Sequence, residues 1–286
     1  NELREEMNSF LPLGEDIQNA LPEERTLRDA ANYSLMADGK RMRPVIAWMM
    51  GMEFGLNKQD LIPVLKSLEY MHTASLIFDD LPSQDNAAAR RGQPALHIAY
   101  TNAIAELTGI FLIQKATLEQ ASIQSFKPEA VLSLIQYSAN AAMQMCRGQV
   151  IDLEEKKGSV SLEELNSMCF YKTGIGFEAA VMMPAILAEA DEGERQALKQ
   201  FAHHAGIAFQ IKDDLLDTEG NSEALGKPAG QDEENGRSTF VTVLGVDGAR
   251  KQMWHHYCEA IASLPGINRN TDFLKHLLDY LINRQR

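Results

Sequence analysis

The sequence is poor in cysteine, in aromatic residues and in long apolar runs. Its three cysteines, Cys146, Cys169 and Cys258, are scattered over 286 residues with no CxxC pair or other metal-ligand spacing. An odd number of dispersed thiols is typical of a reducing compartment rather than of a secreted domain stabilised by disulfides. No apolar run is long enough to span a bilayer, and no signal-peptide pattern is visible. We therefore expect a cytoplasmic protein that does not span a membrane.

Basic residues are also scarce. The chain has 27 Lys and Arg against 40 Asp and Glu, which gives a formal net charge of -13. This balance argues against nucleic acid as a partner, because binding to a phosphate backbone needs surfaces rich in Lys and Arg. At 45% hydrophobic residues the chain can still bury a large core. The positions of the few basic residues are therefore more informative than their number.

Helical periodicity runs through most of the chain. Apolar residues recur three and four positions apart, and Ala, Leu, Met, Glu and Gln are frequent. Ser161 and Glu164 have the spacing of a capping box, and Pro128 suits the first turn of a helix. The Asn-Gly pair at 235–236 lies in a polar loop and is not flanked by alternating strands. These patterns predict one all-α domain over residues 1–286, with about ten helices of ordinary length.

Two polar segments, residues 79–97 and 218–239, interrupt the helices, and an acid pair at the end of an apolar stretch introduces each of them. The acids concerned are Asp79, Asp80, Asp85, Asp213, Asp214 and Asp217. Asp213 and Asp217 share a helix face, where like charges repel. Alone, this second motif is explained equally well by a solvated acidic helix end and by a metal site. Six carboxylates around one cavity would need cations, and Mg²⁺ takes a few carboxylates together with substrate phosphates.

The basic residues lie in or beside loops and breaks marked by Gly or Pro. They are Lys40, Arg41, Arg43, Arg90, Arg91, Lys172, Lys227 and Arg237. Arg is suited to bidentate contact with phosphate, and Lys contributes a point charge. Each of these residues alone is explained as a surface base. Together with two acid clusters, they indicate a polyanionic substrate that is bound partly through cations.

The sequence resembles the trans-isoprenyl diphosphate synthases of the polyprenyl synthetase family, of the bacterial farnesyl/geranylgeranyl diphosphate synthase type. The matching segments occur in the family's order: GKRMRP, HTASLIFDDLPSQDN, RRGQP, GQVIDLE, YKTG, AFQIKDDLLD, LGKPAGQD and GRST. The resemblance implies the isoprenoid synthase fold, a single helical bundle around a central cavity, usually in a homodimer. It also implies three Mg²⁺ ions per active site. The substrates would be isopentenyl diphosphate and an allylic diphosphate of the dimethylallyl, geranyl or farnesyl type.

The resemblance also implies a role for each matching residue. Direct metal ligands would be Asp79, Asp85 and Asp213, and the metal shell would be completed, partly through water, by Asp80, Asp214 and Asp217. The allylic diphosphate would be held by Arg90, Lys172 and Lys227, and isopentenyl diphosphate by Lys40, Arg43, His72 and Arg91, with Arg237 as a further substrate-binding base. The reacting carbons would face Thr173 and Gln210, which would stabilise developing positive charge. Metal ions and bases can stabilise the leaving group without a protein nucleophile. Without the resemblance, His72 would be read as a core histidine.

Product length depends on the residue five positions before the first aspartate in such synthases. A bulky aromatic residue there favours farnesyl diphosphate, whereas this chain has Ala74, followed by Ser75. A small side chain leaves room in the product tunnel for another isoprene unit. Tyr70, one turn deeper on the same face, would then form the floor of the tunnel. We therefore predict the C20 product, geranylgeranyl diphosphate. A block from another helix would instead give a shorter product.

The chain departs from the family pattern at Phe78, Gln84, Ala87–Ala89 and Ile110. None of these changes removes a proposed ligand or diphosphate base, but they bear on substrate preference. Four alternatives remain open. They are a farnesyl diphosphate synthase, a class I terpene cyclase, a non-catalytic synthase subunit and an acidic helical scaffold. The second diphosphate site and the two intact aspartate motifs favour the synthase over the last three.

Overall fold

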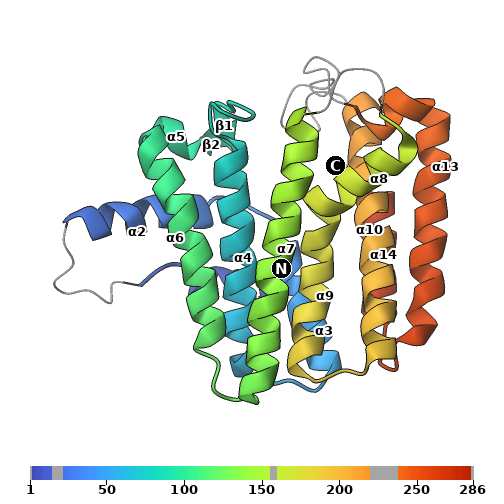
Figure 1. Cartoon of the computed structure of the whole chain (residues 1–286), viewed down its shortest axis with the longest axis horizontal. Helices are drawn as coiled ribbons and strands as arrows, with labels where there is room; N and C mark the ends of the chain where they lie inside the picture. Colours follow the sequence, from blue (N-terminus) through green and yellow to red (C-terminus); the bar gives the residue numbers. More distant parts are fainter. Residues whose placement is uncertain (1, 15–21, 155–159, 220–237, 285–286) are drawn as a thin grey trace. The chain divides into compact units, whose positions relative to one another are not determined.

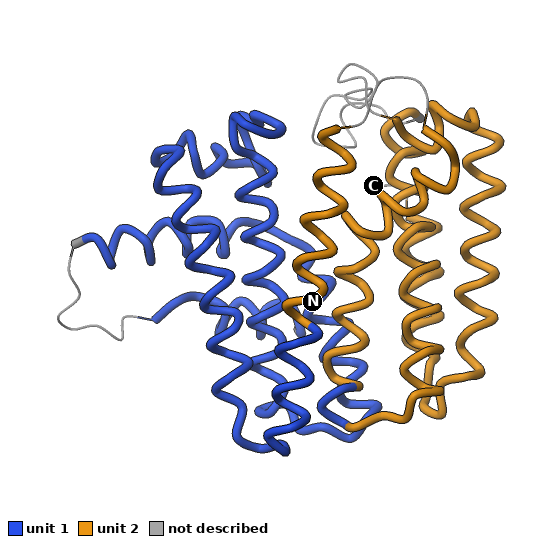
Figure 2. The backbone as a smooth tube through the Cα atoms, viewed as in Figure 1, with its two compact units in different colours: residues 1–137, 186–188 blue, residues 138–185, 189–286 orange. Residues whose placement is uncertain are grey.

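The computed structural model describes residues 2–14, 22–154, 160–219 and 238–284. The chain divides into two compact units, which Figure 2 colours separately: residues 1–137 with 186–188, and residues 138–185 with 189–286. We call them unit 1 and unit 2. Each unit has its own buried core and carries one of the two aspartate motifs.

Unit 1 is built around the long helix α4. Its elements are α1 (Glu2–Phe10), α2 (Pro22–Leu35), α3 (Met42–Glu53), α4 (Lys58–Asp79), β1 (Ala89–Arg90), β2 (Gln93–Pro94), α5 (Leu96–Ala99), α6 (Asn102–Ala121) and the start of α7 (Pro128–Glu154). Helix α4 packs against α2, α3 and α6 (Figure 1). Because Leu61, Leu65 and Tyr70 of α4 are fully buried among these neighbours, the helix is a firm support for the polar residues at its end.

Unit 2 is built in the same way around α10. After the end of α7 it contains α8 (Leu162–Cys169), the π-helix η1 (Phe170–Gly174), α9 (Ile175–Leu187) up to residue 185, α10 (Glu192–Glu219), α13 (Phe240–Ser263), the 3₁₀-helix η2 (Leu264–Gly266) and α14 (Asp272–Asn283). Helix α10 packs against α8, η1, α13 and α14, with α13 running alongside it in Figure 1. Leu198, Ile207 and Ile211 of α10 are fully buried. The second aspartate motif therefore lies on the central helix of its unit.

Several predictions from the sequence are confirmed in the described residues. The chain is all-α apart from one very short hairpin. Ser161 Oγ accepts from the Glu164 N–H at 3.2 Å, and Glu164 Oε2 accepts from the Ser161 N–H at 2.9 Å, so the capping box is present. Pro128 is the first residue of α7. Over the same ranges no helix has both the length and the apolar character needed to cross a membrane. The single-domain organisation stays a prediction.

The hairpin of β1 and β2 is an element that the sequence analysis did not predict. Arg90 pairs with Gln93, which leaves Arg91 and Gly92 as the two turn residues. Both have positive φ angles, 53° and 80°, as a type I′ turn requires. Arg91 here occupies a position at which Asn or Asp is usual, so the customary Asn-Gly signal was absent. The turn matters because it separates the directions of Arg90 and Arg91.

Candidate functional site

The first aspartate motif lies where α4 ends. Asp79 is the last residue of the helix, and Asp80 follows as its C-cap. The backbone then turns back, so that the Asp85 N–H donates to the Asp79 carbonyl oxygen at 2.9 Å. Asp79 is half-buried, Asp80 is buried and Asp85 is exposed. The turn therefore brings Asp85 next to Asp79 while Asp80 remains inside unit 1.

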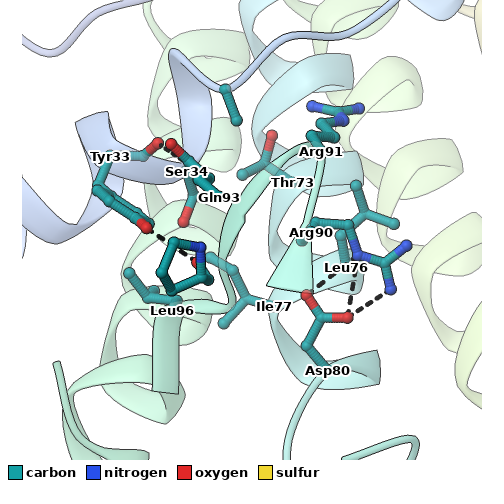
Figure 3. Close-up of a pocket in the computed structure, with 12 residues that line it drawn as sticks. Tyr33, Ser34, Thr73, Leu76, Ile77, Asp80, Arg90, Arg91, Gln93 and Leu96 are labelled. Atoms are coloured by element: carbon teal, nitrogen blue, oxygen red, sulfur yellow. Dashed lines mark hydrogen bonds and ion pairs between the residues drawn. The ribbon is translucent and has the colours of Figure 1, made fainter. Parts of the chain in front are cut away.

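Asp80 is held by Arg90 of the hairpin. Arg90 Nε lies 3.0 Å from Asp80 Oδ1 and 3.1 Å from Oδ2, and Nη2 also donates to Oδ1 (Figure 3). Burial alone would lower the pKa of Arg90, but the hydrogen bonds and charge of Asp80, followed by the charges of Asp79 and Asp85, raise it above its usual value. This charge-assisted contact ties the hairpin to the end of α4.

A small pocket lies between α2, α4 and the hairpin, and Figure 3 shows its lining. Arg90 turns toward Asp80 in this view, whereas Arg91 points away from it. Thr73 also lines the pocket, and its hydroxyl oxygen is buried with no hydrogen-bond partner among the described residues. Buried hydroxyls nearly always have a partner, so Thr73 marks a place where water or a bound polar group fits.

Arg91 joins a group of basic side chains in unit 1 with Arg43 and His72. Arg91 Nη2 lies 3.4 Å from His72 Nε2. Because Arg can only donate, Nε2 is the acceptor and the ring proton belongs on Nδ1. Burial, followed by the charges of Arg43 and Arg91, lowers the pKa of His72 well below its usual value. Burial likewise lowers the pKa of Arg43 and of Arg91. Concentrated positive charge beside a neutral histidine is suited to an anion.

Gly39 and Lys40 border the same group. A Cβ added at Gly39 would lie 2.9 Å from Arg91 Cζ, so only glycine lets the guanidinium approach this closely. Lys40 is exposed beside it. The segments GKRMRP and RRGQP, about fifty positions apart, thus meet in one place. The expected isopentenyl diphosphate residues Lys40, Arg43, His72 and Arg91 are all found at this end of unit 1.

Arg41, between Lys40 and Arg43, has a structural role that the sequence did not reveal. Its side chain is buried, and Nη1 lies 2.5 Å from Glu69 Oε1, which is also buried. The same guanidinium donates to the carbonyls of Leu35 and Ala37. Arg41 itself has a φ angle of 50° at the start of α3. The buried pair fixes the bend from which the neighbouring basic side chains extend.

The predicted chain-length residues lie along α4. Ala74 is 1% exposed and shares a helix face with Tyr70. Tyr70 is fully buried, and its hydroxyl donates to the Leu11 carbonyl at 3.0 Å. Ser75 is half-buried and donates to the His72 carbonyl at 2.8 Å. Tyr70 is therefore an anchored side chain, and its assignment as the next floor stays a prediction.

The second aspartate motif lies on α10, and its first acid is paired with a distant base. Arg284 donates to Asp213 Oδ1 and, at 3.4 Å, to the Phe209 carbonyl. Its guanidinium carbon is 4.2 Å from the centroid of the Phe209 ring. The Arg284 side chain is only 5% exposed, whereas that of Asp213 is 42% exposed. No local sequence pattern links residues 71 positions apart, so this partner was not predicted.

Asp214 and Asp217 are more buried than Asp213. Gln210 Nε2 donates to Asp214 Oδ1 at 3.0 Å, and the Phe240 N–H donates to Asp214 Oδ2 at 2.9 Å. Thr173 Oγ1 in turn donates to Gln210 Oε1 at 3.2 Å. Asp217 is 7% exposed, and its Oδ1 is buried without a partner among the described residues. The carboxylates of the second motif therefore differ in their burial and in their hydrogen-bond partners.

Lys172 and Thr173 lie in the π-helix η1. A π-turn holds one extra residue and is often found at functional sites. Two glycines allow neighbouring helices to approach this turn. A Cβ at Gly148 would lie 2.6 Å from Lys172 N, and one at Gly206 would lie 2.6 Å from Gly174 Cα. Lys172 is paired with Asp152 of the segment GQVIDLE, a contact that the sequence analysis did not foresee.

Within its own unit, each aspartate motif offers oxygen donors that fit Mg²⁺ only in part. In the portion of the chain that the structure describes, no three or more His, Cys, Asp or Glu side chains are placed to hold a metal ion by themselves. Mg²⁺ usually takes one or two carboxylates and completes its shell with phosphate and water. The unpartnered Asp217 Oδ1 and the exposed oxygens of Asp85 suit that arrangement. Lys227 and Arg237 lie outside the described residues.

Comparison with known proteins places these features in a family context. The family model described as "Polyprenyl synthetase" matches residues 24–264. The chain is 37% identical over 263 residues to farnesyl diphosphate synthase of Bacillus subtilis, covering 91% of this chain and 89% of that protein. It is 32% identical to mitochondrial geranylgeranyl pyrophosphate synthase 10 of Arabidopsis thaliana, covering 98% and 84%. A solved FPP/GFPP synthase from Zymomonas mobilis superposes with a TM-score of 0.85 at 30% identity, covering 98% of each chain.

Proposed function

Because the chain belongs to the polyprenyl synthetase family and is a short-chain trans-prenyl diphosphate synthase, we propose that its product is geranylgeranyl diphosphate. The observation that carries the product assignment is Ala74, a small and buried residue five positions before the motif that begins at Asp79. A small side chain there leaves room for the growing chain. The residue roles below are part of the same proposal.

Isopentenyl diphosphate binds to the basic group of unit 1. Arg43 and Arg91 supply charge, and Lys40 reaches the ligand from the surface. His72 is neutral before binding because burial and two guanidinium groups lower its pKa. A bound diphosphate would offset the charges of Arg43 and Arg91, which are the second and third causes of the lowered pKa of His72.

In unit 1, Asp79 and Asp85 would hold Mg²⁺, and in unit 2 the same role would belong to Asp213 and Asp217. When bound, Mg²⁺ stabilises the charge that develops on the departing diphosphate. Arg90 and Lys172 would contact the allylic diphosphate. Each of them is now paired with a carboxylate, Arg90 with Asp80 and Lys172 with Asp152, and would have to leave or share this partner when the diphosphate binds. Lys227 and Arg237, which belong to the same set, are proposed from the resemblance alone.

Thr173 and Gln210 face the allylic carbon as its bond to oxygen breaks. Their oxygen atoms carry partial negative charge and stabilise the cation without reacting with it. Lys172 precedes Thr173 in the π-turn, so one short segment addresses both the leaving group and the carbon that it leaves. The new bond then forms between this carbon and the double bond of isopentenyl diphosphate, and the departing diphosphate takes the proton that is lost.

The product assay tests this proposal directly. The protein is incubated with Mg²⁺, isopentenyl diphosphate and, separately, dimethylallyl, geranyl and farnesyl diphosphates, and the hydrolysed alcohols are identified by length. A C20 alcohol supports the proposal. A C15 end point keeps the reaction and removes the argument from Ala74. A hydrocarbon or cyclic alcohol without elongation indicates a cyclase, and no turnover with any primer indicates a subunit that needs a partner.

Ala74→Tyr tests the chain-length assignment. We expect the longest product to shorten by one isoprene unit, because the aromatic ring occupies the space reserved for the growing chain. Ala74→Ser is the matched control, since it adds one atom and leaves the product unchanged. An unchanged product in Ala74→Tyr, with the variant folded, would place the floor on another residue.

The homodimer expected from the resemblance is also a proposal. Leu107, Ile110 and Leu118 of α6 are each more than half exposed and lie toward one side of that helix, which suits a second copy of the chain. Light scattering of the purified protein gives the mass directly. A monomeric mass across the concentration range would contradict the proposal.

A cytoplasmic location also stays a prediction.

A further inference from the structure

Asp214 is the most completely engaged carboxylate of the second motif. The residue is 5% exposed, and each of its oxygens accepts from one N–H group. One donor is the side-chain amide of Gln210, at 3.0 Å. The other is the backbone N–H of Phe240, the first residue of α13, at 2.9 Å. Asp214 therefore connects α10 to the beginning of α13 and to a neighbour one turn back on its own helix.

The charge of Asp214 decides which way the Gln210 amide faces. A carboxylate only accepts hydrogen bonds, so the NH₂ end of Gln210 must point at Asp214. The Oε1 end then points at Thr173, which donates its hydroxyl proton to it at 3.2 Å. Because Thr173 donates its hydroxyl proton to Gln210, the lone pairs of its oxygen face away from this series of hydrogen bonds. Successive hydrogen bonds of this kind polarise one another in the same direction.

We propose that Asp214 is a positioning residue, which sets the orientation of Gln210 and Thr173, and that it is not a ligand of Mg²⁺. This inference rests on the proposed function of the site, in which those two oxygens face the developing cation. It replaces the role in the metal shell that the resemblance implied for Asp214. The chain from Phe240 N–H through Asp214 and Gln210 to Thr173 is thus the support of the catalytic oxygens.

The neighbouring acids show why Asp214 is the wrong carboxylate for a metal. A metal ion would have to displace two N–H donors, one of which is a backbone group that cannot turn to another acceptor. Leaving such a buried donor unpaired is unfavourable. Asp213 is 42% exposed at its side chain, and Asp217 has an oxygen with no partner among the described residues. These two acids can bind a cation at lower cost than Asp214.

A double-mutant cycle between Asp214 and Gln210 tests the inference. We expect Asp214→Ala to lower kcat by about ten- to a hundredfold, because small misplacements of reacting groups have effects of that size. The KM values for both diphosphates and the Mg²⁺ concentration for half-maximal rate should stay within twofold. In the Gln210→Ala background, Asp214→Ala should lower kcat no further, since both changes remove the same support. Additive losses, or a tenfold higher Mg²⁺ requirement, would overturn the inference.

Thr239→Ala separates the support of Gln210 from the capping of α13. Thr239 Oγ1 accepts from the Thr242 N–H at 3.1 Å, so this variant weakens the same helix start without touching Gln210. It should lower Tm and leave kcat unchanged, whereas Asp214→Ala should lower both. If Thr239→Ala lowers kcat as much as Asp214→Ala, Asp214 acts only through the stability of α13. That result would also overturn the inference.

Metal binding can be followed without turnover. Mg²⁺ with inorganic diphosphate as the probe should raise the Tm of the wild type and of Asp214→Ala by the same amount, and should raise that of Asp213→Ala by less. Loss of the Tm increase in Asp214→Ala would make Asp214 a metal ligand. If the wild type makes no prenyl product, the proposed function fails. The link from Asp214 to Gln210 is then judged by whether their effects on the free energy of unfolding are non-additive.

Discussion

The two aspartate motifs differ in which acid is paired with an arginine. In unit 1 the buried second acid, Asp80, carries the ion pair, and its partner is Arg90. In unit 2 the buried second acid, Asp214, accepts from the N–H groups of Gln210 and Phe240, and the partly exposed first acid, Asp213, is paired with Arg284. Similar strings of letters therefore differ in their local electrostatics. The difference follows from position, because the first motif ends its helix whereas the second stays inside one.

In both motifs the second acid is the one that protein partners hold most firmly. This similarity indicates that the acids of a motif have separate roles. A buried carboxylate needs permanent partners, because an unpaired buried charge is strongly unfavourable. A partly exposed carboxylate such as Asp213 remains in contact with water and can share its charge between a base and a metal ion. We infer that Asp80 and Asp214 organise the two motifs, whereas their neighbours bind the substrate complex. The predictions below test this separation.

The largest effect is expected from the acids that we assign to the metal. Asp79→Ala and Asp213→Ala should each lower kcat by about a hundredfold or more, because charge stabilisation of the leaving group is a dominant contribution. The measurement is steady-state turnover at saturating Mg²⁺, with circular dichroism to show that the helices remain. Activity near the wild-type level in both variants would refute the metal assignment. Full loss in one and none in the other would show that the motifs are not equivalent.

Gly206→Ala should impair unit 2 while the first motif stays intact. The added Cβ would lie 2.6 Å from Gly174 Cα, and a backbone atom cannot move aside as a side chain can. We expect a loss of about 1–3 kcal/mol in the free energy of unfolding, as for other overpacked sites. Gly193→Ala in the same helix is the control, because its Cβ would meet only the end of Asp191, at 3.1 Å. Equal stability of the two variants would show that the close approach is unimportant.

Asp80→Asn removes the charge that holds Arg90. We expect a loss of about 1–3 kcal/mol in the free energy of unfolding, the usual penalty when a buried hydrogen-bonding group loses its partner. Chemical denaturation gives the value, and Asp85→Asn, at an exposed position, should change it by much less. If the two substitutions have the same effect, Asp80 is no more an organising residue than Asp85. The contrast drawn between buried and exposed acids would then not hold in unit 1.

Arg284→Gln should ease metal binding at the second motif. Arg284 donates to Asp213 Oδ1, so its removal takes away a competitor for the charge of Asp213. We expect a severalfold decrease in the Mg²⁺ concentration for half-maximal rate, about 1 kcal/mol, as for other partly exposed ion pairs. Titration calorimetry with Mg²⁺ and inorganic diphosphate gives a second measure. A higher Mg²⁺ requirement would instead make Arg284 part of the binding site.

The smallest effect concerns two histidines of unit 2 that lie apart from the motif. His204 Nδ1 and His256 Nδ1 are 2.9 Å apart, a contact that needs one donor and one acceptor. Burial, followed by His203, lowers the pKa of His204 to about 4, with Glu259 opposing the change and His255 adding to it. Burial, followed by His204, lowers the pKa of His256 to about 3.

Because both folded pKa values lie below the unfolded value of 6.5, the folded chain binds fewer protons. The free energy of unfolding is therefore full above pH 6.5 and falls as the pH decreases toward 4 and then 3. Chemical denaturation at several pH values from neutral to mildly acidic measures this slope. His204→Gln should flatten it, and an unchanged slope would assign the acid sensitivity to other groups.

Local sequence patterns predicted much of the fold because they act over one or two helical turns. The capping box at Ser161 and the start of α7 at Pro128 depend on neighbours within four residues, and both are present. The group of Arg43, His72 and Arg91 was reached through the resemblance, since periodicity alone would have made His72 a core residue. The pairs of Arg284 with Asp213 and of Arg41 with Glu69 join distant positions. No rule based on spacing could have found them.

The π-turn at Phe170–Gly174 has a consequence for alignments and for protein engineering. One extra residue is held within an otherwise continuous helical stretch, so the positions after the turn are offset by one residue, about 100°, from the pattern of an uninterrupted α-helix. Deleting a single residue there would restore an ordinary helix with no visible break. The helices on either side would keep their places, and the side chains within the turn would change direction. A variant lacking one residue in this segment would look well folded by its helical content and yet have Thr173 facing the wrong way.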